Sequence, residues 1–171
     1  AVPKLIVYRL LRPATRGADP VKLICREDDA ERLATALASH ALDVVIADTP
    51  APPHVRVKVF NHLLGESDTA FFAPEPLASK LRRRFPASLD DVPMLIPTPN
   101  TAVRRGLDAW FDTVRVRPRI LGEFEDSALM KAFGQGMGAA FPASAAIARD
   151  ICRFYGVRVI GRTDAVRERY Y

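Results

Sequence analysis

Apolar residues follow two alternating patterns along the chain: short continuous runs, and longer segments in which they recur every three or four positions. The runs predict strands at 21–26, 42–47, 55–60, 70–73, 94–96, 119–124, 139–141 and 157–160. The periodic segments predict helices at 2–11, 29–39, 76–84, 101–114, 127–133 and 144–154. Strands that alternate with helices favour an α/β fold with largely parallel sheets.

The clearest helix covers 101–114. Its apolar side chains fall on one helical face: Val103, Leu107, Trp110, Phe111 and Val114. Such a face is typical of a helix that packs on a core. We therefore expect Trp110 and Phe111 to pack in the interior rather than to stack on a ligand.

A break in the pattern divides the chain. Prolines crowd 49–54, a density that suits neither a helix nor a central strand, and a turn is predicted at 65–68. The break predicts a first lobe at 1–69, a second lobe at 70–162 and a return toward the first lobe at 163–171. The chain enters its first helix without a preceding strand and stops as an apolar run begins, so we expect the first lobe to be incomplete in this fragment.

The charges and the apolar residues exclude several classes of protein. The net charge is +5, from 25 Lys and Arg against 20 Asp and Glu, but the cations are scattered. The densest run, 82–84, ends a predicted helix, where cations interact favourably with the exposed carbonyls. No basic stripe with aromatics and no helix-turn-helix pattern is visible, so these residues are not expected to contact nucleic acid. No segment approaches the roughly 20 apolar residues that span a bilayer.

Two features bear on the cellular compartment. No signal-peptide pattern opens the chain. Cys25 and Cys152 lie far apart, outside metal-ligand spacing and within apolar stretches, so both are predicted to be buried small hydrophobes. Nothing requires an oxidising compartment, and we expect a soluble, cytoplasmic protein with no membrane partner.

The usual catalytic motifs do not assemble. The histidines His40, His54 and His62 fall at a helix end, in the proline-rich loop and in a turn, and none accompanies a Ser or Cys nucleophile. The glycine-rich stretch 134–138 follows a helix, whereas phosphate-binding loops follow a strand and open a helix. It is interpreted as a helix C-cap and turn. We therefore expect neither an enzyme nor a cofactor.

Polar residues gather where predicted strands end and helices begin, at 26–29, 98–101 and 123–127. In open α/β sheets, ligands bind beyond the carboxyl ends of the strands. Helix capping explains one residue at each junction but not why carboxylates and hydroxyls crowd all three. The sequence therefore predicts a ligand site that the three junctions share, in a cleft between the lobes.

The charge of that ligand stays open. Helix N-termini favour an anion, and the polar side chains that would join them are Thr98, Asn100, Thr101 and Ser127. Carboxylates would instead offer oxygen ligands to a hard cation. The candidate cation ligands are Asp28, Asp29, Glu125 and Asp126, with Glu27 and Glu123 beside them.

Several segments resemble one family of regulators. Residues 41–48 (ALDVVIAD) are similar to a strand that follows the second helix in effector domains of LysR-type transcriptional regulators. Residues 121–134 (LGEFEDSALMKAFG) resemble a signature of the NhaR branch, which regulates sodium/proton antiporters. Residues 94–97, 110–111 and 159–162 match that branch in order and spacing. The resemblance spans essentially the whole chain.

The resemblance implies a periplasmic-binding-protein type II-like α/β fold, in which two lobes joined by crossover strands enclose an inducer cleft. By motif position, the inducer contacts of the family fall on Pro3, Asp29, Ala30, Thr98, Asn100, Thr101, Asp126 and Ser127. Many relatives carry Ser or Thr where Ala30 stands, which weakens the expectation of an ordinary carboxylate inducer.

The function implied is that of an effector-binding and oligomerisation domain. A small molecule or ion would control DNA binding by an N-terminal winged helix-turn-helix domain that this sequence lacks, and the protein would form a homodimer or tetramer. The alternative is a solute-binding protein of a transport system, which shares the fold. A small enzyme on the same fold would need a nucleophile or an acid–base pair at the cleft, and a pure oligomerisation module would have an empty, apolar cleft.

Overall fold

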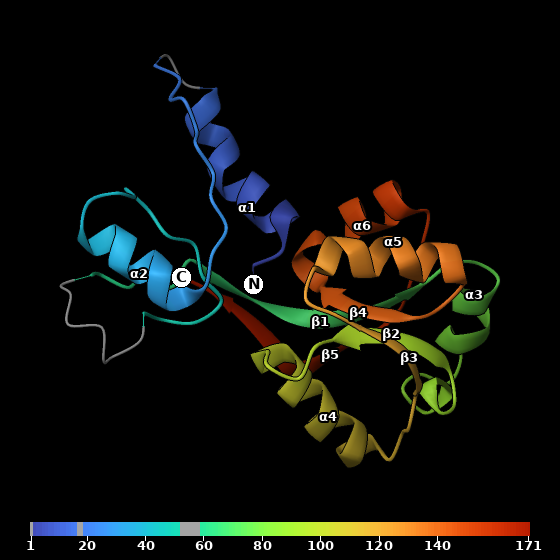
Figure 1. Cartoon of the computed structure of the whole chain (residues 1–171). Helices are drawn as coiled ribbons and strands as arrows, with labels where there is room; N and C mark the ends of the chain where they lie inside the picture. Colours follow the sequence, from blue (N-terminus) through green and yellow to red (C-terminus); the bar gives the residue numbers. More distant parts are fainter. Residues whose placement is uncertain (1, 17–18, 52–58) are drawn as a thin grey trace. The chain divides into compact units, whose positions relative to one another are not determined.

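The computed structural model describes residues 2–16, 19–51 and 59–171, and they form two compact units (Figure 1). Ser67–Glu168 make up the unit called lobe two here, and Val2–Glu66 with Arg169–Tyr171 make up lobe one. The sequence predicts lobe limits at 69/70 and 162/163. The units instead divide within two strands, β1 (Gly65–Ala73) and β5 (Arg158–Tyr170).

Lobe two is built on a sheet. Strand β1 lies between β5 and β4 (Phe141–Ser144), and β1 and β4 are antiparallel, with Thr69 opposite Ser144. Strands β2 (Pro93–Pro97) and β3 (Arg119–Phe124) pair in parallel. A parallel bridge between Met94 and Ala140 connects β2 to the start of β4. The expectation of largely parallel sheets is thus wrong for the β1–β4 pair.

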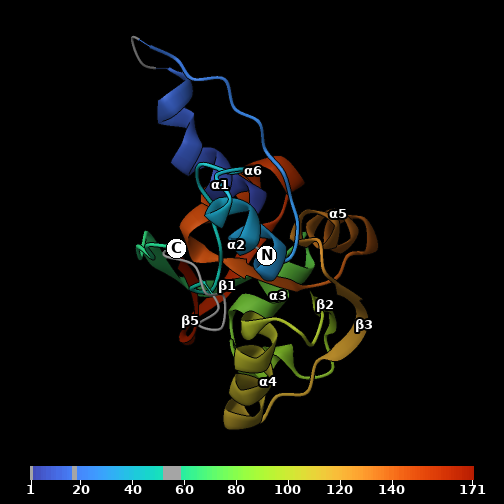
Figure 2. The ribbon, with the colours of Figure 1, turned by 60° about the vertical axis from the view of Figure 1, so that its left-hand side comes forward.

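Helices cover both faces of this sheet. Figures 1 and 2 show α5 (Ser127–Met137) and α6 (Ala148–Tyr155) on one side and α4 (Ala102–Val114) on the other. The helix α3 (Leu77–Arg82) and the short helices η2 (Ala87–Leu89) and η3 (Ala145–Ile147) complete the lobe.

An aromatic cluster forms the centre of the lobe-two core. The ring of Phe71 lies 5.2 Å from Trp110, 5.7 Å from Phe85 and 6.1 Å from Phe111, between ring centroids. Phe71 is fully buried, and Trp110 and Phe111 are buried as well. Tilted and offset rings at such distances contribute about 0.5–1.5 kcal/mol per pair beyond the area they bury. The prediction that Trp110 and Phe111 pack in the core is confirmed.

Polar residues open β1, where a turn was expected at 65–68. That expectation is wrong, because the polar side chains that face inward find hydrogen-bond partners. The Ser67 hydroxyl accepts from Ser144 Oγ at 2.8 Å and from Ala146 N at 3.0 Å, and Thr69 Oγ1 donates to Val166 O at 2.9 Å. Once paired in this way, buried hydroxyls are compatible with a strand.

Several other boundaries differ from the expected ones. The glycine-rich stretch lies inside α5 as far as Met137, and only Gly138, at φ +67°, serves as the C-cap. Gly134 is required there, since a Cβ on it would lie 2.3 Å from Phe141 Cδ1. Strand β4 begins two residues later than predicted, and β5 continues ten residues beyond its predicted end at Ile160.

Lobe one contains three helices: α1 (Lys4–Leu11), the short helix η1 (Arg12–Thr15) and α2 (Ala30–Ala38). The predicted strands at 21–26 and 42–47 do not form, and that prediction is wrong. Ala47 alone exchanges two backbone hydrogen bonds with Tyr171, at 3.0 and 2.9 Å. Residues 55–58 of the predicted strand 55–60, and His54, lie outside the described residues.

Two remaining expectations concern surface and membrane. Cys25 is exposed and Cys152 is half-buried, so the prediction of two buried cysteines is wrong. Across the described residues, no helix has the length and the apolar character to cross a membrane.

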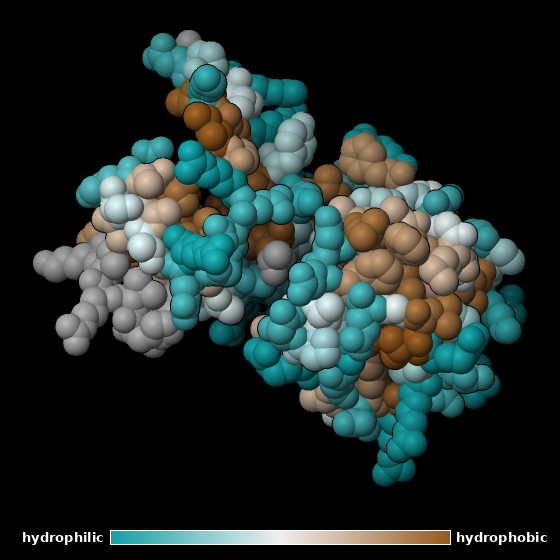
Figure 3. All heavy atoms as spheres, viewed as in Figure 1, coloured by the Kyte–Doolittle hydropathy of each residue, from teal (hydrophilic) through white to brown (hydrophobic). Residues whose placement is uncertain are grey.

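Apolar side chains gather on the visible face of lobe two over α5 and β3 (Figure 3). The exposed ones are Leu129, Phe133 and Met137 on α5, and Ile120 and Leu121 on β3.

Candidate functional site

The carboxyl ends of β2 and β3 bring two of the three polar junctions together. The last residues of these parallel strands, Pro97 and Phe124, are directly paired. Beyond them Thr98 N donates to Phe124 O at 3.2 Å. The loop that leads to α4 and the loop that leads to α5 therefore start side by side, at the position where open α/β sheets bind ligands.

The first loop is held by its own side chains. Thr101 is the N-cap of α4, and its hydroxyl accepts from Arg104 N at 3.2 Å and donates to Thr98 O at 3.2 Å. The Thr98 hydroxyl donates to Asn100 Oδ1 at 2.8 Å. The three polar residues predicted at 98–101 thus form one hydrogen-bonded loop, and capping accounts directly for Thr101 alone.

The second loop begins α5. Asp126 is the N-cap, and its Oδ1 accepts from Ala128 N at 2.6 Å and from Leu129 N at 3.3 Å. Ser127, the first helical residue, is half-buried, and Glu125 is exposed. An N-cap carboxylate satisfies backbone donors of the first turn and offsets the positive end of the helix dipole.

Arg104 links the two loops, although the sequence alone did not single it out. Its side chain is 14% exposed, and Nη1 donates to Pro97 O and to Glu123 Oε1, both at 2.8 Å. Its Nε donates to Asp108 Oδ1 at 2.9 Å. Burial lowers the pKa of Arg104, but the hydrogen bonds and charges of Glu123 and Asp108 outweigh burial, so the pKa is raised. The i, i+4 spacing from Asp108 was the available signal.

Lys131 is a buried cation near the second loop that the sequence did not reveal. It lies in α5 and is 3% exposed, and its Nζ donates to Ser127 O at 2.7 Å. Burial lowers the pKa of Lys131 to about 8, against the opposing effect of the Glu168 and Asp126 carboxylates. Lysine is rarely buried to this extent, and its position four residues after Ser127 was the signal that could have drawn attention to it.

The lobe-one residues lie at two helix starts. Pro3 is the N-cap of α1, and Asp29 is the N-cap of α2, accepting from Arg32 N at 2.9 Å, with Ala30 as the first residue of the helix. Lys4 Nζ lies 3.8 Å from Glu27 Oε1, so the start of α1 and the segment before α2 are in contact. Pro3, Asp29 and Ala30 therefore belong to the same part of lobe one.

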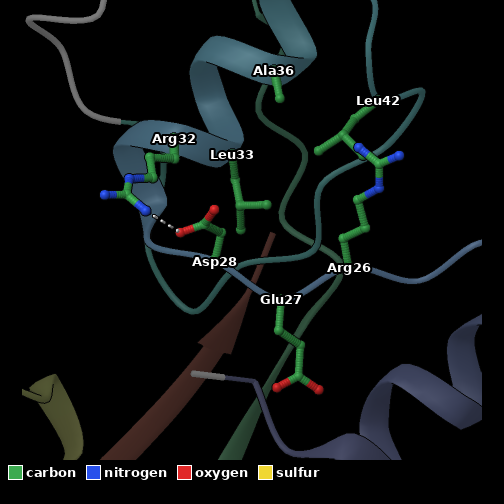
Figure 4. A pocket seen from close by; sticks show the side chains of 7 residues that line it. All are labelled: Arg26, Glu27, Asp28, Arg32, Leu33, Ala36 and Leu42. Atoms are coloured by element: carbon green, nitrogen blue, oxygen red, sulfur yellow. Dashed lines mark ion pairs between the residues drawn. The ribbon is translucent and has the colours of Figure 1, made fainter.

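A pocket of about 400 Å³ opens beside α2 (Figure 4). Its lining comprises Arg26, Glu27, Asp28, Arg32, Leu33, Ala36 and Leu42. Asp28 Oδ1 lies 3.5 Å from Arg32 Nη1, and Glu27 points away from the other lining side chains. The pocket therefore carries carboxylates that already have a cationic neighbour.

No metal centre is assembled by the described part of the chain, in which no group of three or more His, Cys, Asp or Glu could hold a metal ion. Of the candidate cation ligands, Asp29 and Asp126 cap helices and Asp28 pairs with Arg32. Their assignment as cation ligands stays a prediction.

Residues 2–171 match the sequence model of the family described as LysR substrate binding domain. The chain belongs to this family. It is also 35% identical over 171 residues to the transcriptional activator protein NhaR of Escherichia coli K12, and equally similar to NhaR of Shigella flexneri. Each alignment covers the whole of this chain and 56% of the relative, so the chain spans about half the length of these regulators.

Solved structures share the fold at low sequence identity. The LysR family regulator CbnR aligns with a TM-score of 0.71 and 15% identity, over 96% of this chain and 57% of CbnR. The regulatory domain of CcmR from Synechocystis PCC6803, in complex with 2-PG, aligns with a TM-score of 0.67 and 16% identity, over 98% of this chain and 80% of the CcmR chain. The effector binding domain of QuiR, in complex with shikimate, aligns with a TM-score of 0.61 and 13% identity, over 96% of this chain and 79% of the QuiR chain.

These neighbours confirm the predicted periplasmic-binding-protein type II-like fold and the LysR resemblance. The family and these relatives are regulators of transcription, so the alternative of a transport solute-binding protein is not supported.

Proposed function

We propose that the chain is the effector-sensing part of a LysR-type transcriptional regulator, whose DNA-binding domain lies outside this sequence. The similarity to a transcriptional activator over the whole chain supports this role. Among the structural neighbours, CbnR has been crystallised with its target DNA, and CcmR and QuiR with small molecules. A regulator that acts on bacterial DNA works in the cytoplasm, which is the compartment we propose.

The observation that carries the proposal is the polar junction at the carboxyl ends of β2 and β3. Two helix N-termini begin there side by side, and hydroxyl and amide groups surround them. The proposed effector contacts are Thr98, Asn100, Thr101, Asp126 and Ser127 in lobe two, with Pro3, Asp29 and Ala30 in lobe one. A ligand that binds two conformations with different affinity shifts their populations, so no covalent chemistry is needed.

We further propose that the effector is a small polar molecule with an anionic group, rather than a cation. Glu123 already forms a 2.8 Å ion pair with Arg104, and Asp28 pairs with Arg32. Asp126 is occupied by two backbone N–H groups. A cation would have to compete with these partners, whereas at the start of α4, where the N-cap is the uncharged Thr101, the positive end of the helix dipole favours an anion.

Self-association is part of the same proposal. Leu129, Phe133 and Met137 recur every four residues along α5 and are each about half exposed. A contiguous exposed apolar stripe of this kind is typical of a protein–protein contact. We propose that the regulator is a homodimer or tetramer.

The experiment compares wild type with a Thr98→Val/Ser127→Ala double variant in the full-length protein. DNA sites are first located by chromatin immunoprecipitation, and affinity for those sites is then measured with acetate, phosphate, sodium chloride or potassium chloride added. We expect at least one anion to change the affinity of wild type and the double variant to lose that response. The control is Thr113→Val, which removes a hydroxyl bound to Ala109 O at 2.8 Å near the other end of α4. A double variant that responds like wild type would contradict the proposed site.

A further inference from the structure

Lys131 is a buried lysine without a role so far. Its side chain runs back along α5 toward the start of the helix, where Nζ donates to Ser127 O at 2.7 Å. Neighbouring positions on the same helix, Met130 and Gly134, are buried with it. An ammonium group can donate three hydrogen bonds and is costly to bury, so a lysine that is 3% exposed calls for a compensating environment.

Two carboxylates supply part of that environment. Glu168 on β5 and Asp126 at the start of α5 both favour the charged form of Lys131, whereas burial disfavours it. Helix α5 also packs against β2, β3, β4 and α6. Strands β2 and β4 carry no ionisable side chain, and the ionisable residues of the other two elements are Arg119, Glu123, Arg149, Asp150, Cys152, Arg153 and Tyr155. The charges that act on Lys131 are thus Glu168 and Asp126.

The charge balance at the start of α5 then differs from the one that the sequence suggests. Read along the chain, Glu123, Glu125 and Asp126 make an acidic junction that would attract a cation. In the folded lobe Arg104 pairs with Glu123, Lys131 lies beneath the turn that Asp126 caps, and Glu125 is exposed to solvent. Together with the positive end of the helix dipole, the ammonium offsets the one negative charge of Asp126.

We propose that Lys131 is a specificity-determining residue of the effector site, which gives the start of α5 its preference for an anionic effector over a cation. Lys131 acts as a positioning residue, because it does not contact the ligand itself but donates to the carbonyl of Ser127, which does. This inference rests on the proposed function, in which Asp126 and Ser127 contact the effector.

The test measures binding to the full-length protein by calorimetry and thermal shift. The probes are sodium acetate, sodium glycolate and sodium phosphate, against sodium and lithium chloride at matched ionic strength. Lys131→Met and Lys131→Arg are compared with wild type, and Lys80→Met, at an exposed position of α3, controls for the loss of a lysine. We expect an anion to bind wild type and Lys131→Arg at pH 7, and Lys131→Met to bind it at least about tenfold more weakly.

A pH profile separates this role from a merely structural one. Since the pKa of Lys131 is about 8, anion affinity in wild type is expected to fall between pH 7 and pH 9. In Lys131→Met and Lys131→Arg the affinity should stay level over the same range. If Lys131→Met does not fold, Lys131→Gln serves instead, because the glutamine amide can still donate a hydrogen bond but carries no charge. That variant should also bind the anion more weakly than wild type, and its affinity should stay level with pH.

The outcomes are distinct. Anion binding that Lys131→Met, or Lys131→Gln in its place, leaves unchanged overturns the role of Lys131 and leaves the proposed function intact. Saturable binding of sodium or lithium without any anion binding overturns it as well, while still identifying an effector. If no probe binds at all, the proposed effector site itself fails, and the role of Lys131 fails with it.

Discussion

The two lobes contain similar stretches of apolar sequence but use them differently. In lobe two the run at 94–96 is almost completely buried, at 0% exposure for Met94 and Leu95 and 1% for Ile96. In lobe one the run at 21–26 remains exposed, at 53% for Val21 and 71% for Ile24. Four of the six residues at 21–26 are apolar, although Lys22 and Arg26 are charged, so composition alone does not explain the difference.

Strand partners explain it. Strand β2 pairs with β3 on one side and, through Met94, with Ala140 on the other, so its backbone donors and acceptors are satisfied while its side chains enter the core. Among the described residues, 21–26 belong to no strand pair. An apolar run becomes a strand only when neighbouring backbone completes its hydrogen bonds. Among the described residues of lobe one, the buried apolar side chains are accordingly few, namely Pro3, Ile6, Ala34 and Tyr170.

The largest effect is expected from truncation in the lobe-two core. Phe71→Ala removes a fully buried ring that contacts Phe85, Trp110 and Phe111, and should lower the free energy of unfolding by about 3–5 kcal/mol. Phe60→Ala in lobe one removes a ring that is 87% exposed, and should change stability by less than about 0.5 kcal/mol. Urea denaturation measures both, and a comparable loss in the two variants would break the contrast between the lobes.

The buried lysine of lobe two should make stability depend on pH. Its folded pKa of about 8 lies below the ordinary value near 10.4, so between these values the unfolded chain binds more protons and stability increases as the pH rises. Below pH 8 the full cost of the buried ammonium remains. The difference in unfolding free energy between wild type and Lys131→Met should therefore change by about 3 kcal/mol between pH 7 and pH 10.5.

An exposed lysine of lobe one provides the reference for that measurement. Lys22→Met also removes one lysine but no buried charge. Denaturant unfolding at a series of pH values gives a difference curve for each variant. Superimposable curves would show that the buried Lys131 affects the pH dependence of stability no more than the exposed Lys22 does.

The smallest effect compares two glycines of α5 in lobe two. A Cβ at Gly134 would lie 2.3 Å from the buried Phe141 ring, so Gly134→Ala should destabilise by about 1–3 kcal/mol through overpacking. A Cβ at Gly136 would meet nothing within 4 Å, so Gly136→Ala should stabilise the helix by up to about 1 kcal/mol. Thermal denaturation distinguishes the two signs. Equal effects would mean that the close contact between α5 and β4 adjusts without cost.

Much of lobe two could be predicted from local patterns. Helix α4 was predicted within one residue because its apolar face and its N-cap, Thr101, are both local signals. The limits of β3 were predicted without error. The polar start of β1 could not be, because Ser67 and Thr69 become suitable for a buried strand only through partners about 77 and 97 residues away. The strands predicted at 21–26 and 42–47 of lobe one were wrong for the same reason, because strand formation depends on pairing with segments that are distant in sequence.

The residues of the candidate site likewise fall into those that local sequence patterns predict and those that only the fold reveals. Thr98, Thr101, Asp126 and Ser127 were predicted because strand ends and helix caps are visible in sequence. Arg104 and Lys131 were not, because their significance depends on which carboxylates and carbonyls they meet after folding.

The sequence by itself determined the α/β class, the family, most helices of lobe two and the polar junctions at the ends of its strands. These depend on periodicity and capping, which act over a few residues. Only the tertiary structure decided which apolar runs pair as strands and which charges at the junctions are neutralised. Strand pairing and the energy of a charge both depend on neighbours that are distant in sequence, and on the burial that those neighbours create.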